Sequence, residues 1–392
     1  MKIPYGIHYL DRKDIESVSN ALRQKFITQG SIVEKFESKI CKLVKSKYAV
    51  AVSSCTAGLH IAIAAVDKSK NRNEIITSPI SFVSTANTII MNNYKVNFTD
   101  INNESLNIDV ENFSKKIKKN KKTNIVIPVH LGGLAADSKK IYQLCKKKKI
   151  TIIEDAAHSF GGKYEDGSMV GSCKNSDMTV FSFHPVKTIT TGEGGVVTTN
   201  SKILYHKLLM LRNHGIEKNK NFFLRKKLAF TKRKINPWYY EAQTIGFNYR
   251  ITDFQCALGI SQIKKIKSFI SKRKKIAIKY DKEFKDLKNL KLPQCKRREF
   301  SSNHLYILNI DFDKIKLSKN EFMKHLVKKG IITQVHYIPI PLHPYYSKSG
   351  HKMKKLRNAT NYYEKALSIP IFFNLTEKNQ KKIIKFIKDT IK

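Results

Sequence analysis

The chain has 392 residues, of which 41% are hydrophobic and 27% are charged. This composition excludes a disordered chain, and the length is sufficient for two or three domains with a sizeable core. The formal net charge is +43, and 63 of the 74 basic residues are lysines spread over the whole length. Because binders of nucleic acid usually gather arginine and aromatic residues on one face, we interpret the excess as a solvated basic surface and expect no nucleic-acid partner.

The six cysteines show neither a C-x-x-C spacing nor a Cys/His pattern typical of a metal site. The first ten residues lack the apolar core of a signal peptide, and no run approaches the 18 apolar residues of a membrane-spanning helix. We therefore expect a cytoplasmic protein with free thiols, without a metal and without a membrane partner.

Between residues 48 and 199, short runs rich in β-branched residues alternate with helical stretches. This alternation predicts a mostly parallel sheet covered by helices, with functional residues at the carboxyl ends of the strands. The expected strands are Tyr48–Val52, Glu74–Thr77, Lys95–Phe98, Asn124–Val129, Thr151–Glu154, Met178–Phe181 and Gly195–Thr199. The expected helices are Thr56–Val66, one that begins near Phe82, and Lys139–Lys147.

The second half of the chain begins with a segment, Glu217–Glu241, that is rich in Lys and Arg and has few periodic apolar positions. This pattern favours a long surface excursion. One long amphipathic helix is expected over Thr252–Leu287, followed by a smaller α+β domain. Its expected elements are strands at Leu305–Asp311 and Thr333–Tyr337 and helices near Glu321–Lys329 and Glu377–Lys388.

Three expected strand ends carry polar residues of different chemical kinds. A Ser-, Gly- and Pro-rich turn contains Lys187, another strand ends at Asp155, and a third leads into a helix that begins near Thr56. Pyridoxal phosphate needs a lysine amine, an acid that keeps its pyridine nitrogen protonated, and an anion site at a helix N-terminus. Lys187, Asp155 and Thr56 match these requirements. Ser182 is a second phosphate donor, and Phe82 is a candidate stacking ring.

Each of these residues has an ordinary structural interpretation when it is taken alone. Most lysines are solvated, Asp155 or Thr56 could simply cap a helix, and Phe82 could belong to the core. A single histidine such as His158 is more often structural than a ligand. The prediction therefore rests on the joint arrangement, in which three strand ends each supply a different requirement of one cofactor.

Four segments, in this order, closely resemble the DegT/StrS-type sugar aminotransferases, and the resemblance extends over essentially the whole chain. It implies the aspartate aminotransferase-like fold of the type I pyridoxal-phosphate enzymes, with a large cofactor domain over residues 1–250 and a small α+β domain over residues 251–392. It also implies a homodimer that acts on a nucleotide-linked ketosugar. The four segments are Ser53–Leu59, Glu154–Ser159, Ser182–Gly195 and Gly246–Gln255.

The resemblance also implies roles at matching positions. Lys187 would form the Schiff base with pyridoxal 5′-phosphate, Asp155 would pair with the pyridine nitrogen, and His158 would lie beside the phenolic edge. The other cofactor-binding residues would be Cys55, Thr56, Phe82, Ser182 and, reaching the phosphate of the neighbouring subunit, Asn248. The substrate site would be lined by Tyr5, Lys25, Phe26, Ile27, Thr28, Ser182, Asn248, Arg250, His336 and Tyr337.

Further stretches narrow the resemblance to enzymes that aminate a UDP-linked 4-keto-6-deoxy-N-acetylhexosamine at C4, with L-glutamate as donor and 2-oxoglutarate as second product. These stretches are Arg72–Asn87, Phe181–Gly195, Ser301–Tyr306 and Thr333–Pro339. Lys25 and Arg250 are candidates for binding the diphosphate of the substrate.

Two departures and two alternatives accompany this interpretation. Cys55 occupies a position where the family usually has Gly, and Lys187 separates the chain from relatives that carry His there and act as dehydratases. One alternative is an aminotransferase for another nucleotide ketosugar, of the perosamine or bacillosamine type. The other is a basic regulatory or RNA-binding protein that kept the fold and lost catalysis.

Overall fold

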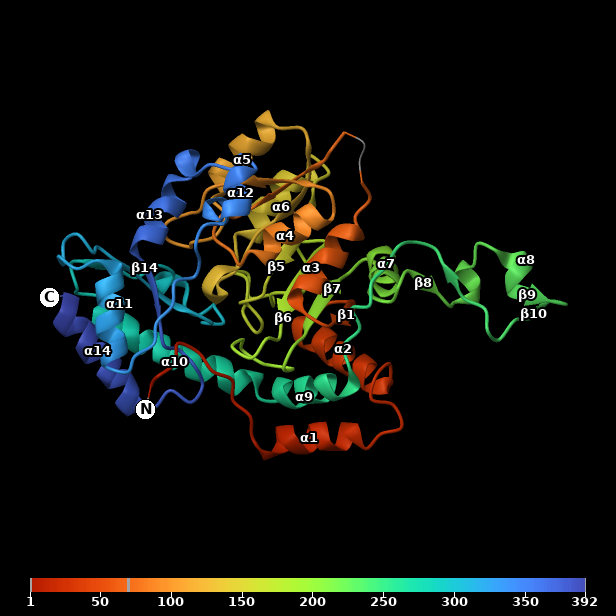
Figure 1. The fold of residues 1–392 in the computed structure, drawn as a ribbon, viewed down its shortest axis with the longest axis horizontal. Helices are drawn as coiled ribbons and strands as arrows, with labels where there is room; N and C mark the ends of the chain where they lie inside the picture. Colours follow the sequence, from red (N-terminus) through yellow and green to blue (C-terminus); the bar gives the residue numbers. More distant parts are fainter. Residues whose placement is uncertain (1, 69–70, 392) are drawn as a thin grey trace.

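The computed structural model describes residues 2–68 and 71–391. Its centre is a seven-stranded sheet in the order β1-β7-β6-β5-β4-β2-β3 (Figure 1). β7 is antiparallel to both of its neighbours, β1 and β6, and the other neighbouring pairs are parallel. The prediction of a mostly parallel sheet is therefore confirmed. The strands are β1 (Tyr48–Val52), β2 (Glu74–Thr77), β3 (Lys95–Phe98), β4 (Thr123–Ile127), β5 (Thr151–Asp155), β6 (Met178–Ser182) and β7 (Gly195–Thr199).

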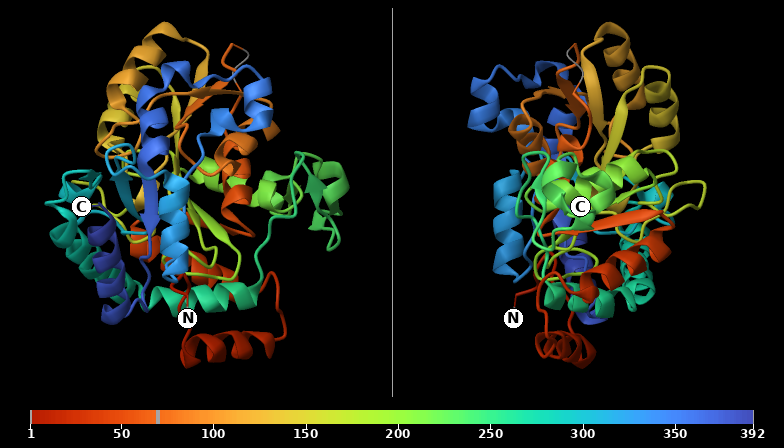
Figure 2. Two further views of the ribbon diagram at one scale, coloured as in Figure 1. Left: turned by 60° about the vertical axis from the view of Figure 1, so that its left-hand side comes forward. Right: turned by 90° about the vertical axis from the view of Figure 1, so that its right-hand side faces the viewer.

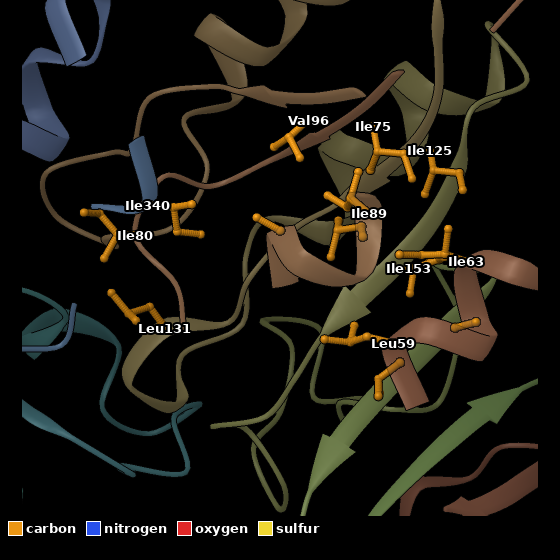
Figure 3. Close-up of a cluster of buried hydrophobic side chains, with 14 of the residues drawn as sticks. Leu59, Ile63, Ile75, Ile80, Ile89, Val96, Ile125, Leu131, Ile153 and Ile340 are labelled. Carbon is orange, nitrogen blue, oxygen red and sulfur yellow. The ribbon is translucent and has the colours of Figure 1, made fainter. Parts of the chain in front are cut away.

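Helices cover both faces of this sheet because successive strand residues point to opposite sides. Val50 and Val52 of β1 belong to the apolar cluster under α3, α4 and α7, part of which is drawn in Figure 3. Ala49 and Ala51 belong to the cluster under α2 and α9. The helices of this part are α1 (Arg12–Leu22), α2 (Ser31–Val44), α3 (Cys55–Ala64), α4 (Ser84–Met91), α5 (Val110–Lys119), α6 (Ser138–Lys146), α7 (Lys202–Arg212) and α9 (Asp253–Ile263).

The C-terminal part is built on a three-stranded antiparallel sheet in the order β12-β13-β14. Its apolar cluster joins this sheet to α10, α11 and α14 and also contains Ile3 from the start of the chain. Helix α9 packs against α1 and α2, and α10 spans both parts, with Phe269 in the cluster of α2 and α9 and Tyr280 in the C-terminal cluster. The division at residue 250 stays a prediction. The elements are α10 (Ile266–Phe284), β12 (Leu290–Lys291), β13 (Tyr306–Ile310), α11 (Lys319–Lys328), α12 (Pro344–Lys348), α13 (Arg357–Lys365), β14 (Ala366–Ile369) and α14 (Glu377–Ile391).

Two sequence-based expectations about elements are wrong. The single helix expected over Thr252–Leu287 is broken between α9 and α10. At the break, the amides of Lys264 and Lys265 donate to carbonyl oxygens three residues earlier, at 3.2 and 3.0 Å, instead of four. The Lys265 ammonium group also lies 2.5 Å from the carboxylate of Asp14. The stretch expected as a strand at Thr333–Tyr337 is irregular. It pairs with β14 only at Gln334, opposite Ser368.

The expected surface excursion is present and projects away from the body of the molecule, at the right of Figure 1 and again in Figure 2. Its short elements pair only among themselves and with the chain just before it. Large apolar side chains lie exposed on it, including Trp238 and Leu224 at 75% and 73%. The elements are β8 (Ile216–Glu217), α8 (Lys226–Ala229), β9 (Phe230–Thr231), β10 (Lys234–Ile235) and β11 (Glu241–Ala242).

Among the described residues, no helix combines the length and the apolar character that crossing a membrane requires. All six cysteines are free thiols.

Candidate functional site

A cavity of about 840 Å³ lies where the strand-end motifs meet the irregular segment 334–338. We call it the central cavity. Strands β1, β5 and β6 run in the same direction, so their carboxyl ends meet at one edge of the sheet. The sequence-predicted residues that line the cavity are Tyr5, Cys55, Thr56, Phe82, Asp155, His158, Ser182, Lys187, His336 and Tyr337.

The N-terminus of α3 forms one end of the central cavity. The hydroxyl of Ser54 caps the helix by accepting the amide of Ala57 at 3.1 Å. The amides of Cys55 and Thr56 stand in the first turn, where a helix offers them no partner, and they can bind an anion. Gly195 makes this geometry possible, because a Cβ there would lie 2.7 Å from the Cys55 nitrogen. The position of Cys55 itself accepts a side chain, which is half-buried at the cavity wall.

Asp155 is a buried carboxylate at the end of β5, with 5% of its surface exposed. Its Oδ2 accepts a hydrogen bond from the hydroxyl of Thr85 at 2.7 Å, and its Oδ1 accepts one from the amide of Ala157 at 3.2 Å. The hydroxyl of Thr85 also lies 2.7 Å from that of Ser81. Thr85 therefore fixes the rotamer of Asp155, a role that the sequence analysis missed because 70 residues separate the two.

The neighbouring carboxylate, Glu154, has a different environment. It points to the other face of the sheet and accepts hydrogen bonds from Ser138, Tyr164 and Thr179 at 2.6, 2.6 and 2.7 Å. Burial alone would raise its pKa, but His130 and these hydrogen bonds outweigh burial and lower the pKa to about 2. Glu154 is therefore a satisfied structural anion, and of the two adjacent carboxylates only Asp155 lines the central cavity.

Lys187 lies on a turn between β6 and β7. Its amide donates to the carbonyl of His184 at 2.9 Å, and the hydroxyl of Thr190 closes the turn by donating to the carbonyl of Phe183 at 3.0 Å. Burial lowers the pKa of the Lys187 amine to about 8, although nearby Cys55 and Asp155 favour the charged form. The amine is therefore still mostly protonated at neutral pH, but its neutral, nucleophilic form is far more populated than that of an ordinary lysine.

His158 is held in one tautomer. Its Nδ1 accepts the amide of Gly132 at 3.3 Å, so the proton is on Nε2, which donates to the hydroxyl of Tyr337 at 2.9 Å. Burial and the nearby Lys187 charge hold the pKa of His158 well below its usual range, so the ring stays neutral. Since the Tyr337 oxygen accepts this bond, its own hydrogen remains available to a ligand.

Two other predicted aromatic residues, Tyr5 and His336, lie next to each other with ring centroids 5.3 Å apart. His336 Nδ1 lies 2.9 Å from the hydroxyl of Ser368, and burial lowers the pKa of this histidine to about 3. The predicted stacking ring, Phe82, is 58% exposed at the cavity wall. It is therefore not an ordinary core residue.

His304 has no role predicted from the sequence, although it lies in one of the motifs that carry the resemblance, Ser301–Tyr306. This histidine is buried, lines the central cavity and lies with its ring centroid 4.5 Å from that of His158. Other lining residues that were not predicted are Ser54, Ser81, Val83, Ser84, Val129, His130, Ala157, His184, Val186, Glu193, Gln334, Val335, Ile338 and His343. Within residues 2–68 and 71–391 no cluster of three His, Cys, Asp or Glu residues could hold a metal ion.

Six predicted site residues do not line the central cavity of their own chain. They lie near the start of α9, where Thr28 pairs with Thr252 and the Asp253 carboxylate accepts the amide of Gly30 at 2.9 Å. All of them are exposed except Arg250, which is half-buried. Arg250 donates to the side-chain oxygen of Asn213 at 2.5 Å. We call this set the outer rim: Lys25, Phe26, Ile27, Thr28, Asn248 and Arg250.

The residues of the central cavity fit pyridoxal 5′-phosphate. The first turn of α3 and the hydroxyls of Thr56 and Ser182 form an anion cradle, Asp155 is a buried carboxylate that can face a pyridinium nitrogen, and Lys187 supplies an amine of lowered pKa. The exposed ring of Phe82 completes the set of groups that this cofactor requires.

Comparison with known proteins agrees with this chemistry. Residues 8–388 match the model of the DegT/DnrJ/EryC1/StrS aminotransferase family. The chain is 36% identical, over 99% of its length and 96% of the relative, to the UDP-4-amino-4,6-dideoxy-N-acetyl-β-L-altrosamine transaminase of Campylobacter jejuni.

Among solved structures the chain resembles PseC of Helicobacter pylori, an aminotransferase involved in the biosynthesis of pseudoaminic acid. The TM-score is 0.90 at 31% identity, with 100% and 99% of the two chains covered. It also resembles a protein of Streptococcus pneumoniae described as a sugar aminotransferase, in its PLP form. Here the TM-score is 0.87 at 25% identity, with 100% and 98% covered.

Proposed function

Because the chain belongs to the DegT/DnrJ/EryC1/StrS aminotransferase family, we propose that it is the transaminase that forms UDP-4-amino-4,6-dideoxy-N-acetyl-β-L-altrosamine in pseudaminic acid biosynthesis. Its substrate is the corresponding UDP-linked 4-keto-6-deoxy-N-acetylhexosamine, and its amino donor is L-glutamate, which leaves as 2-oxoglutarate. The full-length similarity to a relative of this name supports the substrate class. The observation that carries the proposal is that Lys187 and Asp155 line one cavity at the carboxyl edge of the sheet.

The cofactor of this proposal is pyridoxal 5′-phosphate, held by Cys55, Thr56 and Ser182 at the phosphate, by Asp155 at the ring nitrogen and by Phe82 at the ring face. When bound, it supplies an electron-poor ring that stabilises negative charge at the reacting carbon. Thr85 and the Ala157 amide hold the Asp155 carboxylate in place, which keeps it directed at the cavity.

Lys187 is the base and acid of the proposed reaction. Its Nζ takes the proton from the α-carbon of glutamate in the first half-reaction and returns a proton to C4 of the sugar in the second. A pKa of about 8 suits both tasks, because the amine is neither fully charged nor fully neutral at cellular pH. His158 keeps its proton on Nε2 and orients the hydroxyl of Tyr337, which leaves that hydroxyl free to donate to a substrate oxygen.

The working unit of the proposal is a homodimer. The outer rim lies outside the central cavity of its own chain, so Asn248 and Arg250 would contribute to catalysis in the cavity of a second copy. In that arrangement Lys25 and Arg250 bind the diphosphate of the UDP-sugar. The six free thiols support a cytoplasmic location for this activity.

A panel of UDP-linked ketosugars tests the proposal. Purified protein is incubated with the cofactor, L-glutamate and each sugar, and the products are identified by mass spectrometry and NMR. We expect amination at C4 of the 4-keto-6-deoxy-N-acetylhexosamine that leads to the altrosamine product. Preferential amination of a sugar of the perosamine or bacillosamine type would assign the same chemistry to another substrate. A protein that binds no cofactor and aminates none of them would contradict the proposal.

A further inference from the structure

A buried arginine on α10 lacks an acidic partner. Arg273 is 3% exposed, and its Nη1 donates to the carbonyls of His304 at 3.2 Å and Ile371 at 2.8 Å. It takes part in none of the ion pairs found among the described residues. Its Nε is buried without any hydrogen-bond partner. Burial lowers the pKa of the guanidinium to about 10, so Arg273 is charged at neutral pH. A buried charge without a counter-charge is costly for a folded protein.

Arg273 also lines a small cavity that is separate from the central cavity. It offers about 10 Å³ of space to the centre of a water-sized sphere, which is room for one small particle. Thr188 also lines it, and its hydroxyl oxygen is buried without a partner. The lining contains two cationic side chains, Arg273 and Lys187, and no Asp or Glu residue. The complete lining is Ile7, His8, Tyr9, Lys187, Thr188, Thr190, Gln262, Phe269, Arg273 and Phe373.

The unpaired hydrogen-bond donors of the lining residues favour a negatively charged ligand, and the volume of the cavity limits the size of that ligand. Arg273 Nε carries a hydrogen that can only be donated, and the Thr188 hydroxyl can donate a second. Hydrogen bonds from a cation to an anion are stronger than those to a neutral acceptor such as water. The available space excludes polyatomic anions such as phosphate or a carboxylic acid. We propose that Arg273 and Thr188 bind a single monatomic anion, chloride under physiological conditions.

This anion site is adjacent to the catalytic lysine of the proposed function, because Lys187 lines both cavities. It is distinct from the cradle at the first turn of α3, to which neither Arg273 nor Thr188 contributes. The anion therefore compensates the Arg273 charge behind the turn that carries Lys187. The proposal does not depend on the identity of the sugar substrate or on catalysis.

Bromide provides a direct test with the intact full-length protein. Crystals grown with sodium bromide in place of chloride are measured at the bromine absorption edge. We expect an anomalous peak within hydrogen-bond distance of Arg273 Nε and Thr188 Oγ1. An ordered water without anomalous signal at this position would overturn the proposal.

A solution measurement excludes an adventitious ion that binds at crystal concentration only. The Tm of the wild-type protein is compared in chloride, bromide and gluconate at equal ionic strength. We expect the two halides to raise the Tm by about 2–4 °C relative to gluconate, because they bind only the folded state. Thr188→Val and Arg273→Met should lose this gain. The matched control is Arg298→Met, since Arg298 is also buried but is paired with Asp281 at 3.1 Å.

The control variant should be less stable and still gain Tm in halide. If Arg273→Met does not fold, Thr188→Val alone decides the outcome, because it removes one donor and keeps the volume of the side chain nearly unchanged. Equal halide gains in Thr188→Val and in the wild type, or no gain in the wild type, would contradict the anion site. Neither result would affect the test of the proposed transamination, which measures product formed from the sugar panel.

Discussion

The central cavity and the outer rim contain predicted site residues of two different kinds. Those of the central cavity are fixed inside one chain by short contacts, such as the 2.7 Å bond from Thr85 to Asp155. Those of the outer rim are mostly exposed, with Phe26 and Ile27 at 60% and 47%, and none of them lines the central cavity of its own chain. Under the proposed homodimer, a single copy would assemble the reacting groups, and the surface of a second copy would contribute to recognition of the large substrate.

The largest effect on activity is expected from Lys187→Ala, which removes the amine that the proposed reaction in the central cavity requires. Transamination should fall below detection, since loss of the general base alone costs about 10²- to 10⁴-fold. The visible absorbance band of the bound cofactor should also disappear. Activity with glutamate and the absorbance spectrum are measured together, with Lys202→Ala, an exposed lysine at the start of α7, as control. Retention of both signals by Lys187→Ala would refute the assignment.

The sharpest test of the outer rim is complementation between two inactive variants. Lys187→Ala and Asn248→Ala are each expected to be inactive or severely impaired. If the sites are shared between copies, refolding or co-expressing an equal mixture should restore about a quarter of the wild-type activity, because half of the dimers are mixed and one of their two sites is intact. Activity is measured after mixing and compared with the mean of the separate variants. A mixture no better than this mean would place Asn248 outside a shared site.

A smaller effect is expected when only the support of Asp155 is removed. Thr85→Val deletes the hydroxyl that donates to the carboxylate, and a hydrogen bond to a charged group contributes about 1.5–3 kcal/mol. We therefore expect kcat to fall about 10- to 100-fold, with a shifted absorbance maximum of the bound cofactor. The control is Thr88→Val, since the Thr88 hydroxyl bonds only to the carbonyl of Thr85 on the same helix. Equal losses in both variants would indicate a general disturbance of α4.

In the cofactor-free protein, burial of the Lys187 amine should make the free energy of unfolding depend on pH. The pKa of Lys187 is about 8 when folded and 10.5 for an ordinary lysine. Below pH 8 the amine is protonated in both states, and the folded state pays the cost of burying its charge. Above pH 10.5 it is neutral in both.

Lys187→Met should therefore be more stable than the wild type below pH 8, by at most about 3 kcal/mol. The advantage should shrink as the pH rises from about 8 to 10.5. Urea unfolding of both proteins at a series of pH values measures it. A difference that stays constant with pH would show that burial does not lower the pKa of this amine.

The sequence predicted best what local patterns determine. Short runs rich in β-branched residues predicted β1, β2, β3 and β7 at their observed bounds. The residues proposed to bind the cofactor stand at strand ends, where parallel topology brings them together without further information. The break at Lys264 was missed, because the apolar periodicity continues across it and the contacts that accompany it, such as the ion pair of Lys265 with Asp14, join distant parts of the chain.

Contacts between distant parts of the chain were not predictable. The pairing of His158 with Tyr337 joins residues 179 positions apart, and no local pattern predicts it. The same holds for His304, whose place in the central cavity follows from its contacts with the chain near Gly133. The exposed position of the outer rim was likewise invisible, since burial there depends on tertiary packing and not on composition.

The hairpin of β6 and β7 has a consequence for how the protein acquires its cofactor. Ser182 pairs with Gly195, and Gly195 lies against the first residues of α3, so this hairpin directly connects the turn with Lys187 to the anion cradle. In the proposed function, we therefore expect the cofactor-free protein to hold both groups in place already. Uptake of pyridoxal 5′-phosphate should then follow a single second-order step without a slow phase.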